Sequence, residues 1–346
     1  MTIKQLQKII NCAILLAFVV VMLGAYTRLT DAGLGCPDWP GCYGHLMVQS
    51  ASGKSNQLMS STIQQYHLAT VEPRKAWTEM IHRYAAGTLA LFIFFIAFQS
   101  LRLRPSLKKS VLPVVLCSLV IFQALLGMWT VTLKLLPIVV MAHLLGGILI
   151  FSTLICLRIQ STEAYANERY NSNRGILLAV FVGWFIVLFQ VALGGWVSAN
   201  YAGLACIGFP QCNGQWLPAW HLSQGFYLFS PVGQNYQGGL LDNAARVTIQ
   251  YVHRLGAVVT LLYIISLMGY LHKKVANRYV HKISFFILIL VLLQFCLGIG
   301  NVIWRLPLAN AVLHNGVAAL LMASLSVLVC WCRKENSKCI YPRQRV

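Results

Sequence analysis

Apolar residues form eight long stretches along the chain, separated by shorter polar connections. They run approximately from Ile10 to Tyr26, Met80 to Leu101, Val111 to Val131, Ile138 to Leu157, Ile176 to Val197, Thr248 to Leu271, Ile283 to Trp304 and Leu308 to Trp331. Each has the roughly 17 to 25 residues that a helix needs to cross a bilayer. None alternates as a barrel strand does, and backbone groups in lipid must pair within their own segment. The pattern predicts an all-α integral membrane protein with eight transmembrane helices.

Composition agrees with that fold class. Hydrophobic residues make up 58% of the chain and charged residues only 10%, which is too apolar for a soluble domain. The first stretch follows Lys4 and Lys8 and could be mistaken for a secretory signal peptide. It has no small-residue cleavage site and has a counterpart later in the chain, so we expect it to remain as a transmembrane helix.

The net charge of +19 could suggest nucleic acid as a partner, but the positions of the charges indicate topology instead. Most Lys and Arg residues fall at the N-terminus, in the second, fourth and sixth connections and in the C-terminal tail. Two clusters are Arg102, Arg104, Lys108 and Lys109, and Lys273, Lys274, Arg278 and Lys282. By the positive-inside rule these connections and both termini are cytoplasmic. The long connections 27–79 and 198–247 then lie outside, and membrane lipid rather than nucleic acid is the expected partner.

An internal duplication organises the chain. The segment from Leu23 to Gly44 recurs from Leu193 to Gly214, 170 residues later. The later histidines recur in the same way, at an offset of 171 residues. The repeat predicts two tandem four-helix bundles, 1–158 and 176–346, joined by a cytoplasmic linker, 159–175. Because each half has an even number of spans, we expect pseudo-twofold symmetry about the membrane normal.

Four cysteines lie in the two long outer connections. Cys36 and Cys42 have the same spacing as Cys206 and Cys212. In an oxidising compartment this pattern favours the disulfides Cys36–Cys42 and Cys206–Cys212, with a zinc site as the rival interpretation. The other seven cysteines lie in spans or on the inner side, where reduced thiols are expected.

Four histidines form two matched pairs. His82 and His143 lie near the outer starts of the second and fourth spans, and His253 and His314 repeat this arrangement in the second half. If the two helices of a half face each other, two imidazoles converge at one depth, as they do around haem iron in helix bundles. A single such histidine is more often a hydrogen-bonded core residue, and a non-haem metal or a proton path are further alternatives. The duplicated pairing favours haem ligation.

Glu79 marks a difference between the halves. It lies one helical turn before His82, whereas the corresponding residue before His253 is Gln250. A partly desolvated carboxylate can move protons, as the oxidation of a bound molecule requires. The alternative is an acid that stabilises the first turn of a helix through the helix dipole.

Cations are also expected at the outer edge of the membrane. They are Arg28, Arg83, Lys134, Arg254 and Arg305. Each could pair with a haem propionate, or could simply anchor its helix at the interface.

Taken together, these motifs resemble the haem A synthase family of the bacterial CtaA and mitochondrial Cox15 type. The resemblance rests on the eight spans, the Thr27 to Gly44 motif with Cys36-Pro-Asp-Trp-Pro40 inside it, Glu79-x-x-His82-Arg83 and the three later histidines. It implies an oxidoreductase of the bacterial cytoplasmic membrane. Such an enzyme oxidises a ring methyl of haem O to a formyl group by successive hydroxylations, which gives haem A for terminal oxidases.

The resemblance also implies roles for these residues. His82 and His143 would hold the substrate haem, His253 and His314 would ligate a haem b cofactor, and Glu79 would be the essential acid. Implied partners are haem O synthase, cytochrome oxidase assembly factors and an unidentified electron donor or acceptor. The alternatives are a di-haem electron carrier of cytochrome b type and a haem transporter or chaperone.

Overall fold

The computed structural model describes residues 1–48, 72–103, 111–162 and 172–332, and its regular structure there is entirely helical. The helices are α1 (Ile3–Leu29), α3 (Pro73–Leu103), α5 (Leu112–Thr132), α6 (Pro137–Gln160), α8 (Arg174–Ala199), α9 (Leu222–Gly225), α10 (Asn243–Lys274), α11 (Arg278–Ile303) and α12 (Leu308–Cys332). All but the short α9 are long and apolar enough to cross a membrane. The predicted all-α membrane fold with eight spans is confirmed.

Several helices extend beyond their apolar stretches. Helix α3 begins at Pro73 rather than near Met80, and α10 begins at Asn243 rather than near Thr248. The Asp242 side chain accepts a hydrogen bond from the Ala245 amide and so starts α10 in a polar segment. Hydropathy identifies only the part of a helix that suits lipid, so the predicted starts were too late by more than a turn.

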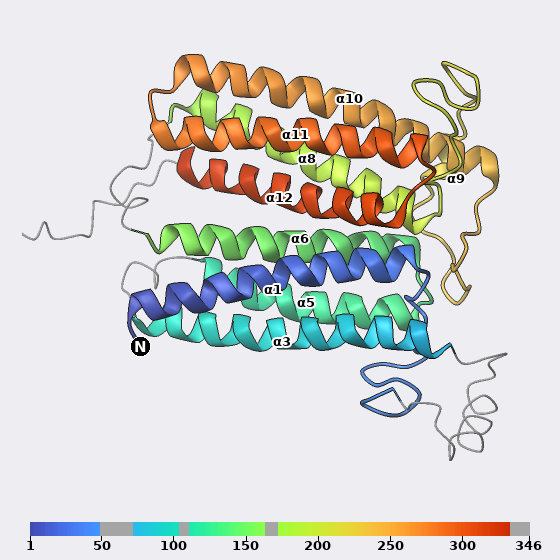
Figure 1. Ribbon diagram of the computed structural model, residues 1–346, viewed down its shortest axis with the longest axis horizontal. Helices are drawn as coiled ribbons and strands as arrows, with labels where there is room; N and C mark the ends of the chain where they lie inside the picture. The colour runs from blue at the N-terminus through green and yellow to red at the C-terminus, as the bar shows by residue number, and fades with distance from the viewer. Residues whose placement is uncertain (49–71, 104–110, 163–171, 333–346) are drawn as a thin grey trace, which may run out of the picture.

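The long helices run side by side in two groups (Figure 1). Helices α1, α3, α5 and α6 form one group, and α8, α10, α11 and α12 form the other. The groups meet where α6 packs on α12, α1 on α12 and α8 on α6. Side chains from both groups, such as Ile10, Phe151, Ile264 and Leu325, belong to one buried apolar cluster.

Turns at corresponding positions support the predicted relation between the halves. Asp31 and Tyr201 both adopt a left-handed backbone conformation, with φ of 51° and 54°, and so do Lys134 and Arg305, with φ of 50° and 56°. Non-glycine residues rarely adopt such angles, so two matched pairs favour a common backbone path. The pseudo-twofold axis and the boundaries of the halves stay predictions, and most of the linker, 163–171, lies outside the described residues.

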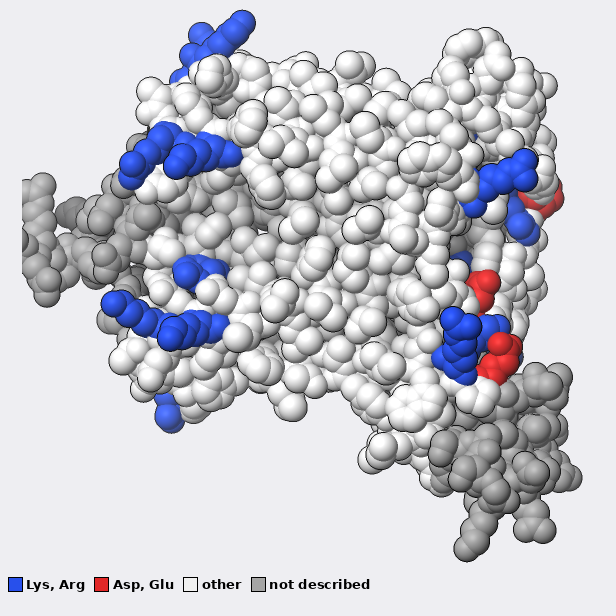
Figure 2. Space-filling model, in the orientation of Figure 1, with Lys and Arg blue, Asp and Glu red and all other residues white. Residues whose placement is uncertain are grey.

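The two ends of the bundle differ in charge. We call the end that carries segments 30–48 and 200–242 the loop end. On the face drawn in Figure 2, Asp and Glu are seen only at the loop end, Lys and Arg are seen at both ends, and an uncharged band separates them. Such a band suits the hydrocarbon layer of a membrane. Some basic residues used in the topology prediction lie outside the described residues, namely Arg104, Lys108, Lys109 and those of the C-terminal tail.

Candidate functional site

The two histidines of the first half converge near the loop end. His82 lies on α3 and His143 on α6, and their ring centroids are 6.4 Å apart with the ring planes at 82°. Each histidine lies between one and three turns inside its helix, so rigid backbone holds both rings. The spacing of these histidines in the sequence predicts such a convergence, and the structure brings the two side chains together.

A glycine on a neighbouring helix makes room for each of these rings. A Cβ atom on Gly24 of α1 would lie 3.0 Å from Cε1 of His82, and a Cβ atom on Gly127 of α5 would lie 3.2 Å from Cε1 of His143. These distances are shorter than most real Cβ contacts, so alanine at either position would require the imidazole to move by a few tenths of an ångström. These glycines therefore determine where the rings can sit.

The second half repeats this arrangement. His253 lies on α10 and His314 on α12, and the two are close enough to interact electrostatically. A Cβ atom on Gly194 of α8 would lie 3.2 Å from Cε1 of His253, and one on Gly298 of α11 would lie 3.3 Å from Cε1 of His314. Each half thus presents two imidazoles, each packed against a glycine of the preceding long helix.

The paired histidines fit a haem group. The imidazoles of His82 and His143, with ring centroids 6.4 Å apart, are the residues that would hold a haem between α3 and α6. The Nδ1 atoms of His82, His143 and His314 are buried, and no donor or acceptor satisfies them at hydrogen-bonding geometry. Two imidazoles suit a metal that brings its remaining ligands with it, as haem iron does.

Glu79 is buried beside the first pair and holds the adjacent loop. Its side chain lies on α3, and the residue is 4% exposed. Oε2 accepts a hydrogen bond from the Cys36 amide at 2.9 Å, and Oε1 pairs with the Arg83 guanidinium. Because α3 begins at Pro73, Glu79 is not in the first turn, and the interpretation as a helix-dipole acid is wrong. Its counterpart Gln250 is also buried, but its Oε1 has no partner.

Two arginines anchor the loops that follow α1 and α8. Arg83 donates to the carbonyl oxygens of Asp38 at 2.9 Å and Gly41 at 2.6 Å. Arg254 donates in the same way to the Gly208 carbonyl at 2.8 Å and to that of Cys206. Their guanidinium groups are therefore engaged by loop carbonyls, an arrangement that the predicted role as propionate partners did not anticipate.

The remaining predicted cations differ in their surroundings. Arg28 of α1 donates to the Ser198 carbonyl, pairs with Asp31 at 3.4 Å and lies 4.0 Å from the Tyr201 ring centroid. It therefore joins the two halves. Lys134 and Arg305 lie exposed in the turns between α5 and α6 and between α11 and α12. A role for these two beside a propionate stays a prediction.

Each cysteine pair lies within one loop. The sulfurs of Cys36 and Cys42 are bonded, as are those of Cys206 and Cys212, so the structure is compatible with the expected pairing. The first pair packs against Ala76 and Met80 of α3, on either side of Glu79. Tyr43, in the same loop, donates to the Gly35 carbonyl at 3.1 Å. Burial and the nearby Glu79 carboxylate raise the pKa of Tyr43 above its ordinary value.

Three glutamines near the histidines were not expected to act at the sites. Nε2 of Gln190 lies 3.1 Å from Nδ1 of His253 and donates to the His253 carbonyl at 3.0 Å. Nε2 of Gln294 lies 3.2 Å from Nε2 of His314, and Nε2 of Gln123 donates to the His143 carbonyl at 2.7 Å. The sequence pattern that could have identified these glutamines is Gln-x-x-x-Gly, which occurs at 123–127, 190–194 and 294–298. In each case the glycine is the one that packs against a histidine ring.

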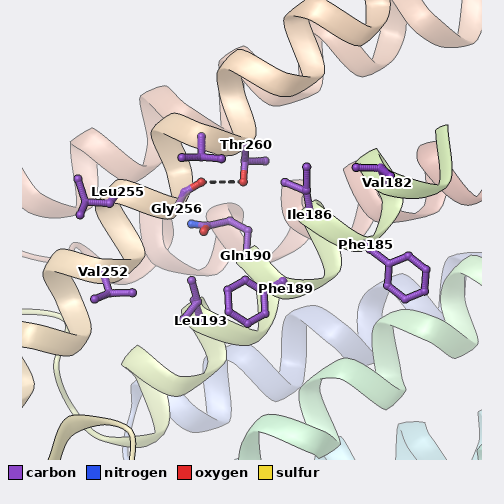
Figure 3. Close-up of a pocket in the computed structure, with 11 residues that line it drawn as sticks. Val182, Phe185, Ile186, Phe189, Gln190, Leu193, Val252, Leu255, Gly256 and Thr260 are labelled. Carbon is purple, nitrogen blue, oxygen red and sulfur yellow. Dashed lines mark hydrogen bonds between the residues drawn. The ribbon is translucent and has the colours of Figure 1, made fainter. Parts of the chain in front are cut away.

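A groove of about 540 Å³ lies between α8 and α10, next to His253. Its lining is apolar apart from Gln190 and Thr260 and includes the exposed rings of Phe185 and Phe189. In Figure 3, Gln190 extends from α8 toward α10, and the Thr260 hydroxyl donates to the Gly256 carbonyl at 2.7 Å. Gln190 is therefore the polar group at this groove that also contacts a histidine.

The sequence is similar to known proteins along nearly its whole length. Residues 7–326 match the family model COX15-CtaA, described as cytochrome oxidase assembly protein. The heme A synthase of Shewanella oneidensis is 40% identical over 321 residues, which cover 93% of this chain and 94% of that protein. The heme A synthase of Caulobacter sp. (strain K31) is 30% identical over 328 residues, covering 89% and 90%, respectively. The matched region reaches all eight long helices.

Proposed function

We infer that this chain, which belongs to the COX15-CtaA family of cytochrome oxidase assembly proteins, is a haem A synthase. As such it is a haem-modifying enzyme of a bacterial membrane, and its product serves oxidase assembly. The observation that carries this proposal is a pair of partly buried, converging imidazoles with a buried carboxylate one turn away, in a chain similar to heme A synthases over nearly its whole length. The reaction we propose is the conversion of a ring methyl of haem O to a formyl group by successive hydroxylations.

His82 and His143 would hold the substrate. Their rings come from α3 and α6 with centroids 6.4 Å apart, so rigid helices on two sides would orient a haem that both histidines hold. Reaction at a peripheral methyl leaves the bonds to the iron intact, so two histidine ligands do not obstruct it. Gly24 and Gly127 let the rings approach this position.

Glu79 would accept and pass on the protons that the oxidation releases. It is buried, and the Cys36 amide and Arg83 hold its carboxylate in place. A positioned carboxylate at such a site is a suitable general base. Gln250 cannot do this, so we assign the chemistry to the first half.

His253 and His314 would hold haem b, which when bound supplies one-electron transfer to the reaction. The support is the repeated histidine and glycine arrangement, together with the absence of an acid at Gln250. We further propose that the loop end faces outward and that both termini are cytoplasmic, because basic residues without acids are seen at the opposite end (Figure 2).

A di-haem electron carrier also has two bis-histidine sites, so the two functions need a direct test. Membranes that contain the chain and a supply of haem O should accumulate haem A, which chromatography of extracted pigment detects. A carrier would yield haem b alone, and a transporter or chaperone would return haem O unchanged. Either outcome would contradict the proposed synthase.

A further inference from the structure

We propose that Gln190 holds His253 as the ligand of a resident haem, whereas Val20, at the matching position of the first half, leaves His82 able to release its haem. The inference rests on the proposed function, because a synthase must retain its cofactor and release its product. The positions match through the repeat, since Val20 and Gln190 each precede by four residues the glycine that contacts the histidine, Gly24 and Gly194 respectively.

In the second half, side-chain amides reach both imidazoles. Nε2 of Gln190 lies 3.1 Å from Nδ1 of His253, and Nε2 of Gln294 lies 3.2 Å from Nε2 of His314. Gln190 extends from α8 across the interface with α10 (Figure 3). The Gln190 contact leaves Nε2 of His253 free for iron, so Gln190 can fix the orientation of the ligand ring and tune its basicity. Gln294 lies at Nε2 of His314 instead, and Nδ1 of His314 has no partner.

In the first half, no side-chain amide reaches either imidazole. Val20 has no polar side-chain group and offers the His82 ring only its backbone, and Nδ1 of His82 is buried without a side-chain partner. Gln123 donates to the His143 carbonyl at 2.7 Å, while Nδ1 of His143 is unsatisfied. His253 therefore differs from the other three histidines, because an amide lies at its Nδ1 whereas their Nδ1 atoms are buried without a partner.

The Gln190 amide can serve His253 in either protonation pattern of the ring. An amide carries both a donor and an acceptor, so Nε2 can donate to an unprotonated Nδ1 and Oε1 can accept from a protonated one. Oε1 is buried beside Gly256 and has no partner in this structure. A protonated Nδ1 of His253 would require the Gln190 amide to turn, so that Oε1 takes the place of Nε2 and accepts the proton.

Gln123 provides the control for a purely structural role. Gln190 and Gln123 both donate to a histidine carbonyl and so join neighbouring helices, but of these two only Gln190 also contacts the ring. Loss of a helix-to-helix bond is therefore common to Gln190→Val and Gln123→Val. Loss of ring positioning of His253 is specific to Gln190→Val.

The experiment measures haem transfer from the purified full-length protein to excess apomyoglobin, followed by absorbance. Gln190→Val should release haem b about 10-fold to 100-fold faster than the wild type, the range typical for loss of such a partner. Val20→Gln should slow release of haem from the first half by about tenfold. Gln123→Val should leave haem b release unchanged.

Two outcomes would overturn the inference. One is an unchanged rate of haem b release from Gln190→Val, and the other is equal acceleration of haem b release by Gln123→Val. If Gln190→Val does not accumulate, Gln190→Glu decides the question. It should retain haem b and shift its midpoint potential downward, because a carboxylate accepts the Nδ1 proton more strongly. An unchanged potential would contradict ring contact. Failure of the wild type to form haem A would instead contradict the proposed function and leave the haem b measurement valid.

Discussion

Glu79 and its surroundings show what a single residue can determine at this site. The repeat singled out Glu79, because its counterpart in the other half is Gln250. The partner of Glu79 was not predictable, because the Cys36 amide lies in a loop 43 residues earlier. Glu79 anchors the loop through the Cys36 amide and is also the proposed proton acceptor. Testing the second role requires a substitution that keeps the first. Glutamine does so, since its amide oxygen still accepts the Cys36 hydrogen bond but cannot accept a proton at neutral pH.

Gly24 allows a test of ring placement at the same scale. In Gly24→Ala the new methyl group would lie 3.0 Å from Cε1 of His82 and should push the ring away from His143. We expect conversion of haem O to fall by about tenfold or more, because small misplacements of a reacting group are costly. The control is Gly87→Ala in α3, where nothing lies within 4 Å of the new Cβ. Equal activity of the two variants would contradict the placement of His82.

At the scale of elements, hydropathy predicted every long helix but not where each begins. Helix α3 begins at Pro73, in a polar segment outside the apolar stretch. Hydropathy therefore does not predict where this helix begins. The contacts of Arg83 and Arg254 were missed for a related reason. Propionate pairing and interface anchoring were both open for these arginines, and neither expectation included the loop carbonyls that accept their hydrogen bonds. A propionate role stays a prediction.

The two loops give a prediction about covalent structure. Non-reducing peptide mapping should link Cys36 to Cys42 and Cys206 to Cys212, since each pair lies within one loop with its Cα atoms 4.8 Å and 4.9 Å apart. A peptide that joins Cys36 to Cys206, or four free thiols in protein prepared without reductant, would contradict this pairing.

At the scale of the whole molecule, the repeat predicted two four-helix groups but not how they meet. Helices α1, α6, α8 and α12 form the contact, and Arg28 extends it at the loop end through Ser198, Asp31 and Tyr201. Tyr201 completes this cluster by donating its hydroxyl proton to Asp31 at 2.8 Å. These contacts join residues far apart in the sequence and depend on how the two helix groups pack together. Local sequence patterns do not predict such packing.

Arg28→Ala tests whether this residue joins the halves or binds haem. As a joining residue, its loss should lower the free energy of unfolding by about 1 kcal/mol, the worth of a partly exposed charged contact. Thermal unfolding in detergent would show this as a lower midpoint, with the amount of haem bound to each half unchanged. Loss of substrate haem without a change in midpoint would favour the propionate role instead.

The most direct test of the account is the haem composition of membranes that contain Glu79→Gln and a supply of haem O. This variant keeps the histidines and an oxygen that can accept from the Cys36 amide, and it loses the proton acceptor together with the ion pair to Arg83. The account predicts haem b and unconverted haem O, with haem A reduced at least about a hundredfold relative to the wild type, as is typical for loss of a general base. Haem A at the wild-type level would contradict it.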